Sequence, residues 1–521
     1  MRSLDHGTHV RALALLSIAA LGAAACSPKV RNYGDGSGGV GEGGGGGGAG
    51  GGEPAAGGGG DGGSGGDGGS GGEGGAAAEP GRLRWAIQIG ENGFDSAASV
   101  AVDPEGNAIV IGRFSGAIDL GGGPIVAQDG SSSYLAKFDG DGKHLWSRSF
   151  GLSLPGGQHV AHGPGGGLFV GGSYFNNLDF GGGPLPQNNG GLGLARFDGG
   201  TGDHVWSKGF GDQYVKELEY VAVDGQGAVL ISGTLGGTAD FGGGPIGDAI
   251  SGNASYVAKL DGDGNHVFTI YIDDGRASLA AGGLAVDAEG NVAIAGTFDQ
   301  NFNLDPTSAP PLVSKGGRDI FFAKVGPKGG LLWQKAFGNS LYDAASQVAF
   351  DAAGSVFLAG MFQGSVDFGG GPLVALGTKP NFFVAKFDPA GNHLYSRGFG
   401  DSEQQDVASI AVDPGGNAVV TGTFLGSIDF DGTVLQSQGT KEDRNGYLGG
   451  GDIFIAKLGI DGKHLFSRQI GDPDMQMAGG VALGPKGEVF AVGSFRGTVD
   501  FGGGPVTTRG ETDGYLMKLD P

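Results

Sequence analysis

The sequence predicts an all-β fold: a seven-bladed β-propeller of four-stranded antiparallel blades, closed by its N-terminal strand and preceded by a disordered Gly-rich linker. One observation is a strand-like phrase ending in an aromatic residue, which recurs seven times at intervals of 60 to 71 residues. Another is that each unit holds four short β-type runs separated by Gly, Asp and Asn, with no helical period. Four strands repeated at a regular interval are typical of a propeller. The recurring aromatic residues are Trp85, Trp146, Trp206, Phe268, Trp333, Tyr395 and Phe466.

The four runs of the first unit are residues 99–102, 109–112, 134–138 and 144–146. An alanine stands at the centre of the first run in every unit, and we expect this small side chain where the innermost strands crowd around the ring axis. A glycine ends the second run in every unit, which indicates a close backbone approach or a bulge. The alanines are Ala101, Ala161, Ala222, Ala285, Ala349, Ala411 and Ala482. The glycines are Gly112, Gly172, Gly233, Gly296, Gly360, Gly422 and Gly493.

The order of the runs predicts how the ring closes. Residues 138–144 read as a tight Asp-Gly hairpin, so the Trp146 strand is the outer, fourth strand of the first blade. By the same rule the Trp85 strand has no blade of its own at the N-terminus. We therefore expect it to pair with residues 515–519 and complete the seventh blade, which removes the exposed sheet edge of an open ring.

Phrases inside the unit resemble the bacterial seven-bladed β-propeller repeat family. The units of that family run from an inner strand through an Asp-Pro-x-Gly-Asn turn to a second strand ending in Gly and a Lys-containing third strand. Here the turn appears at residues 102–107 and 412–417, and one third strand at residues 385–387. The resemblance covers nearly all of residues 82–521. It implies the propeller fold in a secreted bacterial protein and implies no particular activity.

Residues 1–25 have the features of a secretory signal peptide. Arg2 and Arg11 precede an apolar run of about 14 residues, which is too short to span a bilayer as a helix. The only cysteine, Cys26, follows small residues, and residues 21–27 resemble a bacterial lipobox. That resemblance implies a lipid on Cys26, a mature N-terminal segment at residues 26–33 and, with Ser27 next, an exported protein anchored in the outer membrane of the cell envelope. Ordinary cleavage is the alternative, because Ala23 stands where a lipobox usually has Leu.

Residues 34–81 are Gly-rich and contain few apolar side chains, so nothing offsets the entropy of ordering them. We expect a tether that joins the lipid to the propeller at residues 82–521. The chain carries a net charge of −23. This acidity excludes nucleic-acid binding, which depends on Lys and Arg that neutralise phosphates. The N-terminal lipid is then the only expected contact with a membrane, and we expect a monomer.

Several polar residues recur once in each blade, and we interpret them as structural. An Asp or Asn between the second and third strands predicts an Asx turn, and a basic residue in the third strand predicts an intrablade ion pair. The Asp-Gly turn at residues 139–142 lacks the further ligands of a calcium loop. Five histidines that follow such turns lie on different blades, so we expect no metal site and no cofactor. The turn residues are Asp119, Asp179, Asp240, Asn303, Asp367, Asp429 and Asp500, and the basic residues are Lys137, Arg196, Lys259, Lys324, Lys386, Lys457 and Lys518.

Residues that depart from the repeat are the candidates for binding. They lie in loops that enter the inner strands and in an insertion of the sixth blade, and no catalytic set is recognisable. We predict a non-enzymatic binding or scaffold module for a protein or glycan. The alternatives are a glycan-cleaving enzyme that uses Asp343 and Asp406 as acid and base, and a purely structural component of the envelope. The candidate binding residues are Asp95, Lys216, Glu217, Asp273, Asp274, Arg276, Asp343, Asp406, Lys441 and Arg444.

Overall fold

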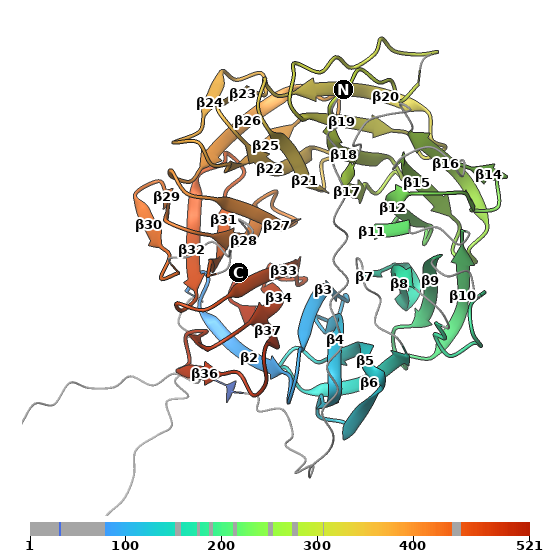
Figure 1. The fold of residues 1–521 in the computed structure, drawn as a ribbon, viewed down its shortest axis with the longest axis vertical. Helices are drawn as coiled ribbons and strands as arrows, with labels where there is room; N and C mark the ends of the chain where they lie inside the picture. The colour runs from blue at the N-terminus through green and yellow to red at the C-terminus, as the bar shows by residue number, and fades with distance from the viewer. Residues whose placement is uncertain are drawn as a thin grey trace, which may run out of the picture.

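The computed structural model describes residues 31–32, 79–151, 158–174, 178–186, 191–211, 216–247, 254–272, 280–305, 307–439 and 450–521. Within these ranges the strands form seven antiparallel blades of four strands each, arranged around a ring (Figure 1); the sheet of blade 7 has one additional short strand at its outer edge. This confirms the predicted fold class. The only helical element in the same ranges is a 3-10 turn, η1 (Pro164–Gly166). No helix of this described part is long and apolar enough to cross a membrane.

Each blade runs from an inner to an outer strand. Blade 1 contains β3 (Ser96–Val102), β4 (Ala108–Asp119), β5 (Pro124–Phe138) and β6 (His144–Gly151); blade 2 contains β7 (His159–His162), β8 (Gly167–Tyr174), β9 (Gly191–Asp198) and β10 (His204–Phe210). Blade 3 contains β11 (Lys216–Val223), β12 (Val229–Leu235), β15 (Ala254–Leu260) and β16 (His266–Ile272); blade 4 contains β17 (Ala280–Val286), β18 (Val292–Phe298), β19 (Asp319–Val325) and β20 (Leu331–Phe337). Blade 5 contains β21 (Asp343–Phe350), β22 (Val356–Phe362), β25 (Asn381–Phe387) and β26 (His393–Phe399); blade 6 contains β27 (Gln405–Val412), β28 (Ala418–Phe424), β31 (Asp452–Leu458) and β32 (His464–Ile470).

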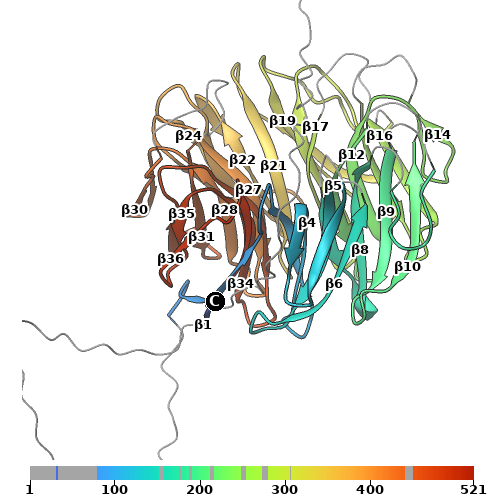
Figure 2. The same cartoon turned by 60° about the horizontal axis from the view of Figure 1, so that its bottom comes forward.

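Blade 7 joins the two ends of the folded region, as the order of the runs predicted. It contains β33 (Gln476–Leu483), β34 (Val489–Phe495), β37 (Asp513–Leu519) and, as its outer strand, β2 (Leu83–Ile89). Strands β2 and β37 pair antiparallel, with Trp85 opposite Lys518 and Ala86 opposite Met517. A two-residue strand, β1 (Arg31–Asn32), pairs with the outer edge of β2 near the C-terminus (Figure 2). Strand β2 therefore closes the ring.

The Asp-containing turns between the second and third strands, which read Asp-Phe-Gly-Gly-Gly-Pro in blades 2, 3, 5 and 7, form small hairpins. In blade 1 the hairpin continues β4 and β5; in four other blades it is a separate two-stranded sheet. These sheets are β13 (Ala239–Asp240) with β14 (Pro245–Ile246), β23 (Ser365–Asp367) with β24 (Pro372–Val374), β29 (Ser427–Phe430) with β30 (Thr433–Gln436), and β35 (Thr498–Asp500) with β36 (Pro505–Thr507). At the turn, Asp119 Oδ1 accepts from the backbone N–H groups of Gly121 and Gly123 at 2.8 and 3.0 Å, so the predicted Asx turn forms.

The hydrophobic core lies between neighbouring blades. On β3, Val100 packs in a cluster with Phe490 and Leu516 of blade 7, whereas Ala101 packs with Val170 of blade 2. The recurring alanine therefore faces the next blade, and the valine before it faces the previous one. A small side chain fits there because the inner strands are the closest elements of adjacent blades.

In every blade except blade 2, whose counterpart lies outside the described residues, the recurring glycine of the second strand faces a break in the inner strand. Opposite Gly112, β3 has a register shift between Ala97 and Ser99, and a Cβ atom on Gly112 would lie 2.0 Å from the Ser96 carbonyl oxygen. Equivalent register shifts interrupt β11, β17, β21, β27 and β33. Both expectations from the sequence, a bulge and a close backbone approach, are confirmed at this position.

The third-strand lysines form the predicted intrablade ion pairs, but with a different carboxylate from that of the Asx turn. Lys137 Nζ lies 2.8 Å from Asp103, in the turn after the inner strand, and also donates to the carbonyl oxygen of Gly199 in blade 2 at 2.8 Å. One buried lysine thus links two blades. The pairs of this type are Lys137–Asp103, Lys259–Asp224, Lys324–Asp287, Lys386–Asp351 and Lys457–Asp413, at 2.8 to 3.1 Å.

The outer-strand histidines pack on the triple-glycine turns. A Cβ atom on Gly122, the middle glycine in blade 1, would lie 2.5 Å from His144 Cε1, and His393 stands equally close to Gly370 at 2.3 Å. Only glycine leaves room for the ring there. Each of these histidines belongs to the packing of its own blade.

Candidate binding site at the ring axis

The seven inner strands surround the axis of the ring (Figure 1), and one position on them differs from blade to blade. It comes directly before the apolar residue that packs between blades. Because the surrounding positions repeat, differences here give the ring one asymmetric region. The residues at this position, from blade 1 to blade 7, are Ser99, His159, Tyr220, Gly283, Gln347, Ser409 and Gly480.

Tyr220 reaches across the ring from blade 3 to blade 5. Its hydroxyl donates to the carbonyl oxygen of Ser346 at 2.9 Å and accepts from the Gln347 side-chain amide at 3.1 Å. The intervening blade 4 has Gly282 and Gly283 at this level, so no side chain blocks the path. The Gln347 amide also donates to Ala408 of blade 6, at 2.9 Å. These hydrogen bonds connect three blades at the axis.

His159 of blade 2 lies beside Tyr220, with the two ring centroids 5.2 Å apart. Burial lowers the pKa of His159 to about 4, so the imidazole is neutral at physiological pH. Burial, together with the charges of Glu219 and Asp406, raises the pKa of the Tyr220 hydroxyl above its usual range. The two rings are therefore an uncharged aromatic pair next to two carboxyl groups.

Glu219 is the bulge residue of β11, at a place where the other described bulges carry Ala, Gly or Ser. Its half-buried carboxyl group makes no hydrogen bond or ion pair with another described residue. Burial, and secondarily the charge of Glu217, raises its pKa to about 7. Asp406 of blade 6 is also half-buried, and burial raises its pKa to about 6 in spite of the Val407 N–H. We call His159, Glu219, Tyr220, Gln347 and Asp406 the axial cluster.

The structure separates the candidate residues predicted from sequence. Asp406 belongs to the axial cluster, and exposed Glu217 lies beside it. Lys216 is the first residue of β11. The remaining candidates, apart from the two buried aspartates considered next, lie outside the described residues, as does the lipidation candidate. They are Asp273, Asp274, Arg276, Lys441, Arg444 and Cys26.

Asp95 and Asp343 do not line the mouth of the ring. Their exposed fractions are 1% and 0%, because each carboxylate turns inward and binds backbone. Asp343 accepts from the N–H groups of Asn339 and Gln363 at 2.9 and 3.3 Å, and Asp95 makes two bonds of the same kind. Asp343 is fully buried and its carboxylate binds the backbone of its own loop, so it does not stand at the channel mouth, where the predicted acid–base pair with Asp406 requires it.

Sequence reasoning missed His159, Glu219, Tyr220 and Gln347. An alignment of the seven inner strands contains a signal for them. Ser or Gly fills the position of His159, Tyr220 and Gln347 in the other blades, and Ala, Gly or Ser fills the position of Glu219 in the other described bulges. The contact between Tyr220 and Ser346 is not visible in such an alignment, since it joins residues 126 positions apart.

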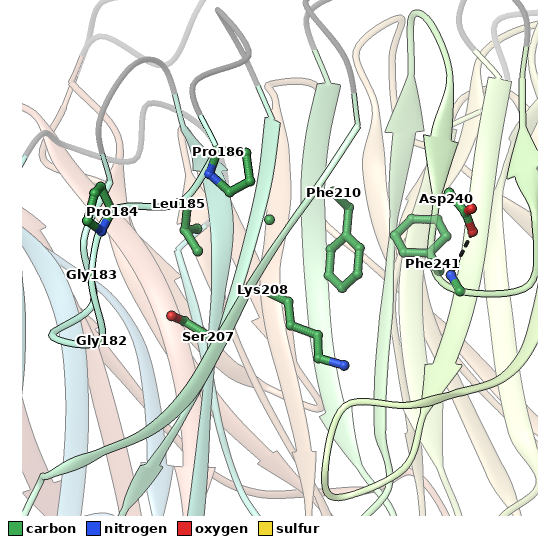
Figure 3. Close-up of a pocket in the computed structure, with 12 residues that line it drawn as sticks. Gly182, Gly183, Pro184, Leu185, Pro186, Ser207, Lys208, Phe210, Asp240 and Phe241 are labelled. Atoms are coloured by element: carbon green, nitrogen blue, oxygen red, sulfur yellow. Dashed lines mark hydrogen bonds between the residues drawn. The ribbon is translucent and has the colours of Figure 1, made fainter.

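The described residues contain no group of three or more His, Cys, Asp and Glu side chains that could hold a metal ion. A hollow of about 550 Å³ lies on the rim, between blades 2 and 3 (Figure 3). It is bordered by residues 182–186, 207–210 and 240–242. Its polar groups serve the fold: Asp240 accepts from Gly242 N–H at 2.7 Å, and Lys208 donates to the Gly264 carbonyl oxygen. The axial cluster is the stronger candidate, because its Glu219 carboxyl group has no such partner among the described residues.

No family model matches the chain. An uncharacterised WD repeat-containing protein of Acanthamoeba polyphaga mimivirus is 25% identical over 154 residues, which are 27% of this chain and 11% of that protein. The chain thus spans about a tenth of the curated relative it matches.

Two solved structures show distant similarity. Hydrazine synthase of Kuenenia stuttgartiensis has 12% identity and a TM-score of 0.38, covering 67% of this chain and 77% of its own. A protein from Lactobacillus plantarum has 14% identity and a TM-score of 0.38, covering 75% and 96%. Similarity at this level transfers no site or activity to the present chain.

Proposed function

We propose that this protein is an exported, lipid-anchored binding module whose propeller holds a partner protein at the axial cluster and performs no chemistry. One observation carries the proposal. The carboxylates that recur in the blades are used within the fold, in Asx turns and buried ion pairs, whereas Glu219 has no described partner and stands directly before Tyr220, which occupies the inner-strand position that differs from blade to blade. An unpartnered acid at the centre of a rigid ring is available to a ligand.

The chemistry of the axial cluster suits a basic group. Glu219, Asp406 and the nearby Glu217 offer carboxylate oxygens, and the Tyr220 and His159 rings are neutral aromatic surfaces beside them. A lysine or arginine side chain bonds with such oxygens and stacks on such rings. The net charge of −23 adds long-range attraction for a basic partner.

The membrane anchor rests on the sequence around Cys26 and on the Gly-rich residues that follow it. A lipidated cysteine at the end of a long tether places a propeller where it can capture a partner near the envelope. We expect Cys26→Ala to move the protein from the membrane fraction to the soluble fraction. Retention in the membrane would remove the anchor from the proposal and leave the propeller's binding role standing.

Binding is tested with the full exported chain carrying Cys26→Ala, used as bait against envelope proteins and on a glycan array. We expect one protein partner, whose affinity falls at least tenfold with Glu219→Gln and with Asp406→Asn, and weakens as salt is added. Glu105→Gln is the matched control, because Glu105 is an exposed acid in a turn of blade 1 and leaves the axial cluster intact.

Three results would contradict the proposal. Capture that is indifferent to both axial substitutions would place the interface elsewhere. Binding to a glycan alone would change the ligand class. Recovery of no specific partner would favour a purely structural role in the envelope.

A further inference from the structure

Neighbouring blades meet through a pair of side chains at the end of the ring where the inner strands begin. The first residue of a third strand lies next to the residue that opens the inner strand of the following blade. We call these contacts seams. At the seam between blades 5 and 6 the pair is Asn381 and Gln405, whereas between blades 4 and 5 it is Asp319 and Asp343.

The amide seam shows what the position requires. Asn381 Oδ1 accepts from the Leu376 N–H at 2.6 Å, and Asn381 Nδ2 donates to Gln405 Oε1 at 2.8 Å. Gly400, with φ +130°, makes room for the contact: a Cβ atom there would lie 2.1 Å from Gln405 Oε1 and 2.3 Å from Asn381 Nδ2. One side chain is the donor and the other the acceptor.

The acid seam has the same geometry. Asp319 Oδ2 accepts from the Lys315 N–H at 2.6 Å and from the Ser314 hydroxyl at 2.7 Å, so it occupies the place of Asn381 Oδ1. Asp319 Oδ1 then occupies the place of Asn381 Nδ2, the donor of the 5–6 seam. Asp319 is only 1% exposed, and its Oδ1 atom is buried without a hydrogen-bond partner among the described residues.

Asp343 occupies the place of Gln405, whose side chain is the acceptor in the 5–6 seam. A Cβ atom on Gly338, the counterpart of Gly400, would lie 2.0 Å from Asp319 Oδ1 and 3.1 Å from Asp343 Oδ2, so these two oxygens lie within about 5 Å of each other. Two ionised carboxylates at that separation in a buried site repel each other. Burial, with the charge of Asp319, raises the pKa of Asp343 to about 7 against the lowering effect of its two backbone bonds.

Few other charges face this pair. Lys315 Nζ donates to the Gly338 carbonyl oxygen at 3.1 Å. Among the described residues it is the one cation whose charge lowers the pKa of Asp343. Arg318 lies over the Tyr342 ring, 5.9 Å from its centroid. The other described groups bonded to Asp343 are backbone amides of the entering loop and of the residue after β22.

The seam between blades 7 and 1, where the ring closes, repeats the arrangement. Asp513 Oδ2 accepts from the Arg509 N–H at 3.1 Å and from the Gln88 side chain, and its Oδ1 is buried without a partner. Asp95 faces it and binds two backbone amides, as Asp343 does. Burial, with smaller contributions from Asp513 and Glu91, raises the pKa of Asp95 to about 6. The nearby Arg509 pairs with Glu91 at 3.1 Å.

We propose that each acid seam holds one proton between its two carboxyl groups, and that losing this proton loosens the ring. The proton supplies the hydrogen bond that Asn381 makes with its amide. Its loss leaves two buried negative charges at the closing seam and at the loop entering blade 5. That loop leads into Ser346 and Gln347, so the axial hydrogen bonds follow the state of the seam.

The direction of the pH effect follows from linkage. The folded-state pKa of Asp343 lies above its ordinary value of 3.8, so the folded protein binds more protons than the unfolded chain between these values. The stability supplied by the proton is complete below pH 4 and is lost as the pH rises through about 7.

Asp319→Asn is the decisive variant, because it installs a permanent amide donor where Asn381 has one. We expect thermal unfolding of the wild-type chain to move to lower temperature between pH 5 and pH 8. Asp319→Asn should remove part of that fall and melt at least 2 °C above wild type at pH 8. Glu289→Gln, a change at an exposed turn acid, is the control and should leave the fall unchanged.

A direct readout does not depend on stability. The infrared carbonyl stretch of a protonated carboxylic acid, measured in the wild-type chain at pH 6, should lose intensity in Asp319→Asn and in Asp343→Asn, and keep it in Glu289→Gln. The proposal is overturned if Asp319→Asn retains the whole band, or if it keeps the wild-type pH dependence of unfolding.

Discussion

Truncation of Trp85 tests the closure of the ring, on which the placement of every blade depends. Trp85 is 3% exposed on β2, and its ring packs edge-on against Phe490 with centroids 6.0 Å apart. The indole N–H donates to the carbonyl oxygen of Gly140 in blade 1 at 3.0 Å. The side chain therefore contributes both to blade 7 and to its junction with blade 1.

The expected cost of Trp85→Ala follows from these contacts. Truncating a buried Trp to Ala costs about 3 to 5 kcal/mol, and leaving the Gly140 oxygen without its donor adds about 1 kcal/mol. The free energy of unfolding should fall by about 4 to 6 kcal/mol, measured by urea denaturation followed by intrinsic fluorescence. Because β2 is distant in sequence from the other strands of blade 7, we also expect new protease cleavage around residues 83–89.

Trp206→Ala is the matched control. Trp206 is the outer-strand tryptophan of blade 2 and makes the same bond, to the Gly262 oxygen at 3.0 Å, but its strand is continuous with its own blade. We expect a loss of stability without cleavage in β10. If Trp85→Ala costs less than 1 kcal/mol and opens no cleavage site in β2, the outer strand does not hold the ring closed.

Two further predictions concern features that recur in the blades. Lys324→Met breaks a buried ion pair of 3.1 Å and leaves the Asp287 carboxylate, whose side chain is 3% exposed, without its cation. The free energy of unfolding, measured by urea denaturation, should fall by about 3 to 5 kcal/mol. Adding Asp287→Asn should restore part of this loss, and an unchanged midpoint in the single variant would contradict the role of the pair. Gly370→Ala places a Cβ atom 2.3 Å from the His393 ring and should destabilise the chain by about 1 to 3 kcal/mol in the same assay. Adding His393→Ala should recover stability, and failure to recover it would show that the ring is not the obstacle.

The architecture was predictable because its rules are local and repeated. The hairpin at residues 138–144 assigns the Trp146 strand to the outer edge of blade 1, and the same reasoning carried to Trp85 places β2 beside β37. The Asx turn of Asp119 depends on residues only two and four positions away, so the local sequence is enough to predict it.

Errors arose where a side chain chooses between partners on different strands. Lys137 had two aspartates of its own blade within the same repeat, and it pairs with Asp103 rather than with Asp119. Asp343 and Asp406 looked alike in the loops before two inner strands. In the register of the inner strands Asp343 corresponds to Gln405, and Asp406 is one residue further along. Alternate residues of a strand point to opposite faces, so Asp343 points into the seam whereas Asp406 belongs to the axial cluster.

By itself, the sequence determined the number of blades, the four strands in each and the manner of closure, since a repeated pattern of short-range turns and alternating apolar residues leaves one compact solution. Only the tertiary structure decided that Tyr220 crosses to Ser346, that Glu219 is left without a described partner, and that two carboxyl groups from adjacent blades share a seam. Those features depend on how blades distant in the chain are brought together around the axis. Such distances are set by the packing of the whole ring, and no local pattern encodes them.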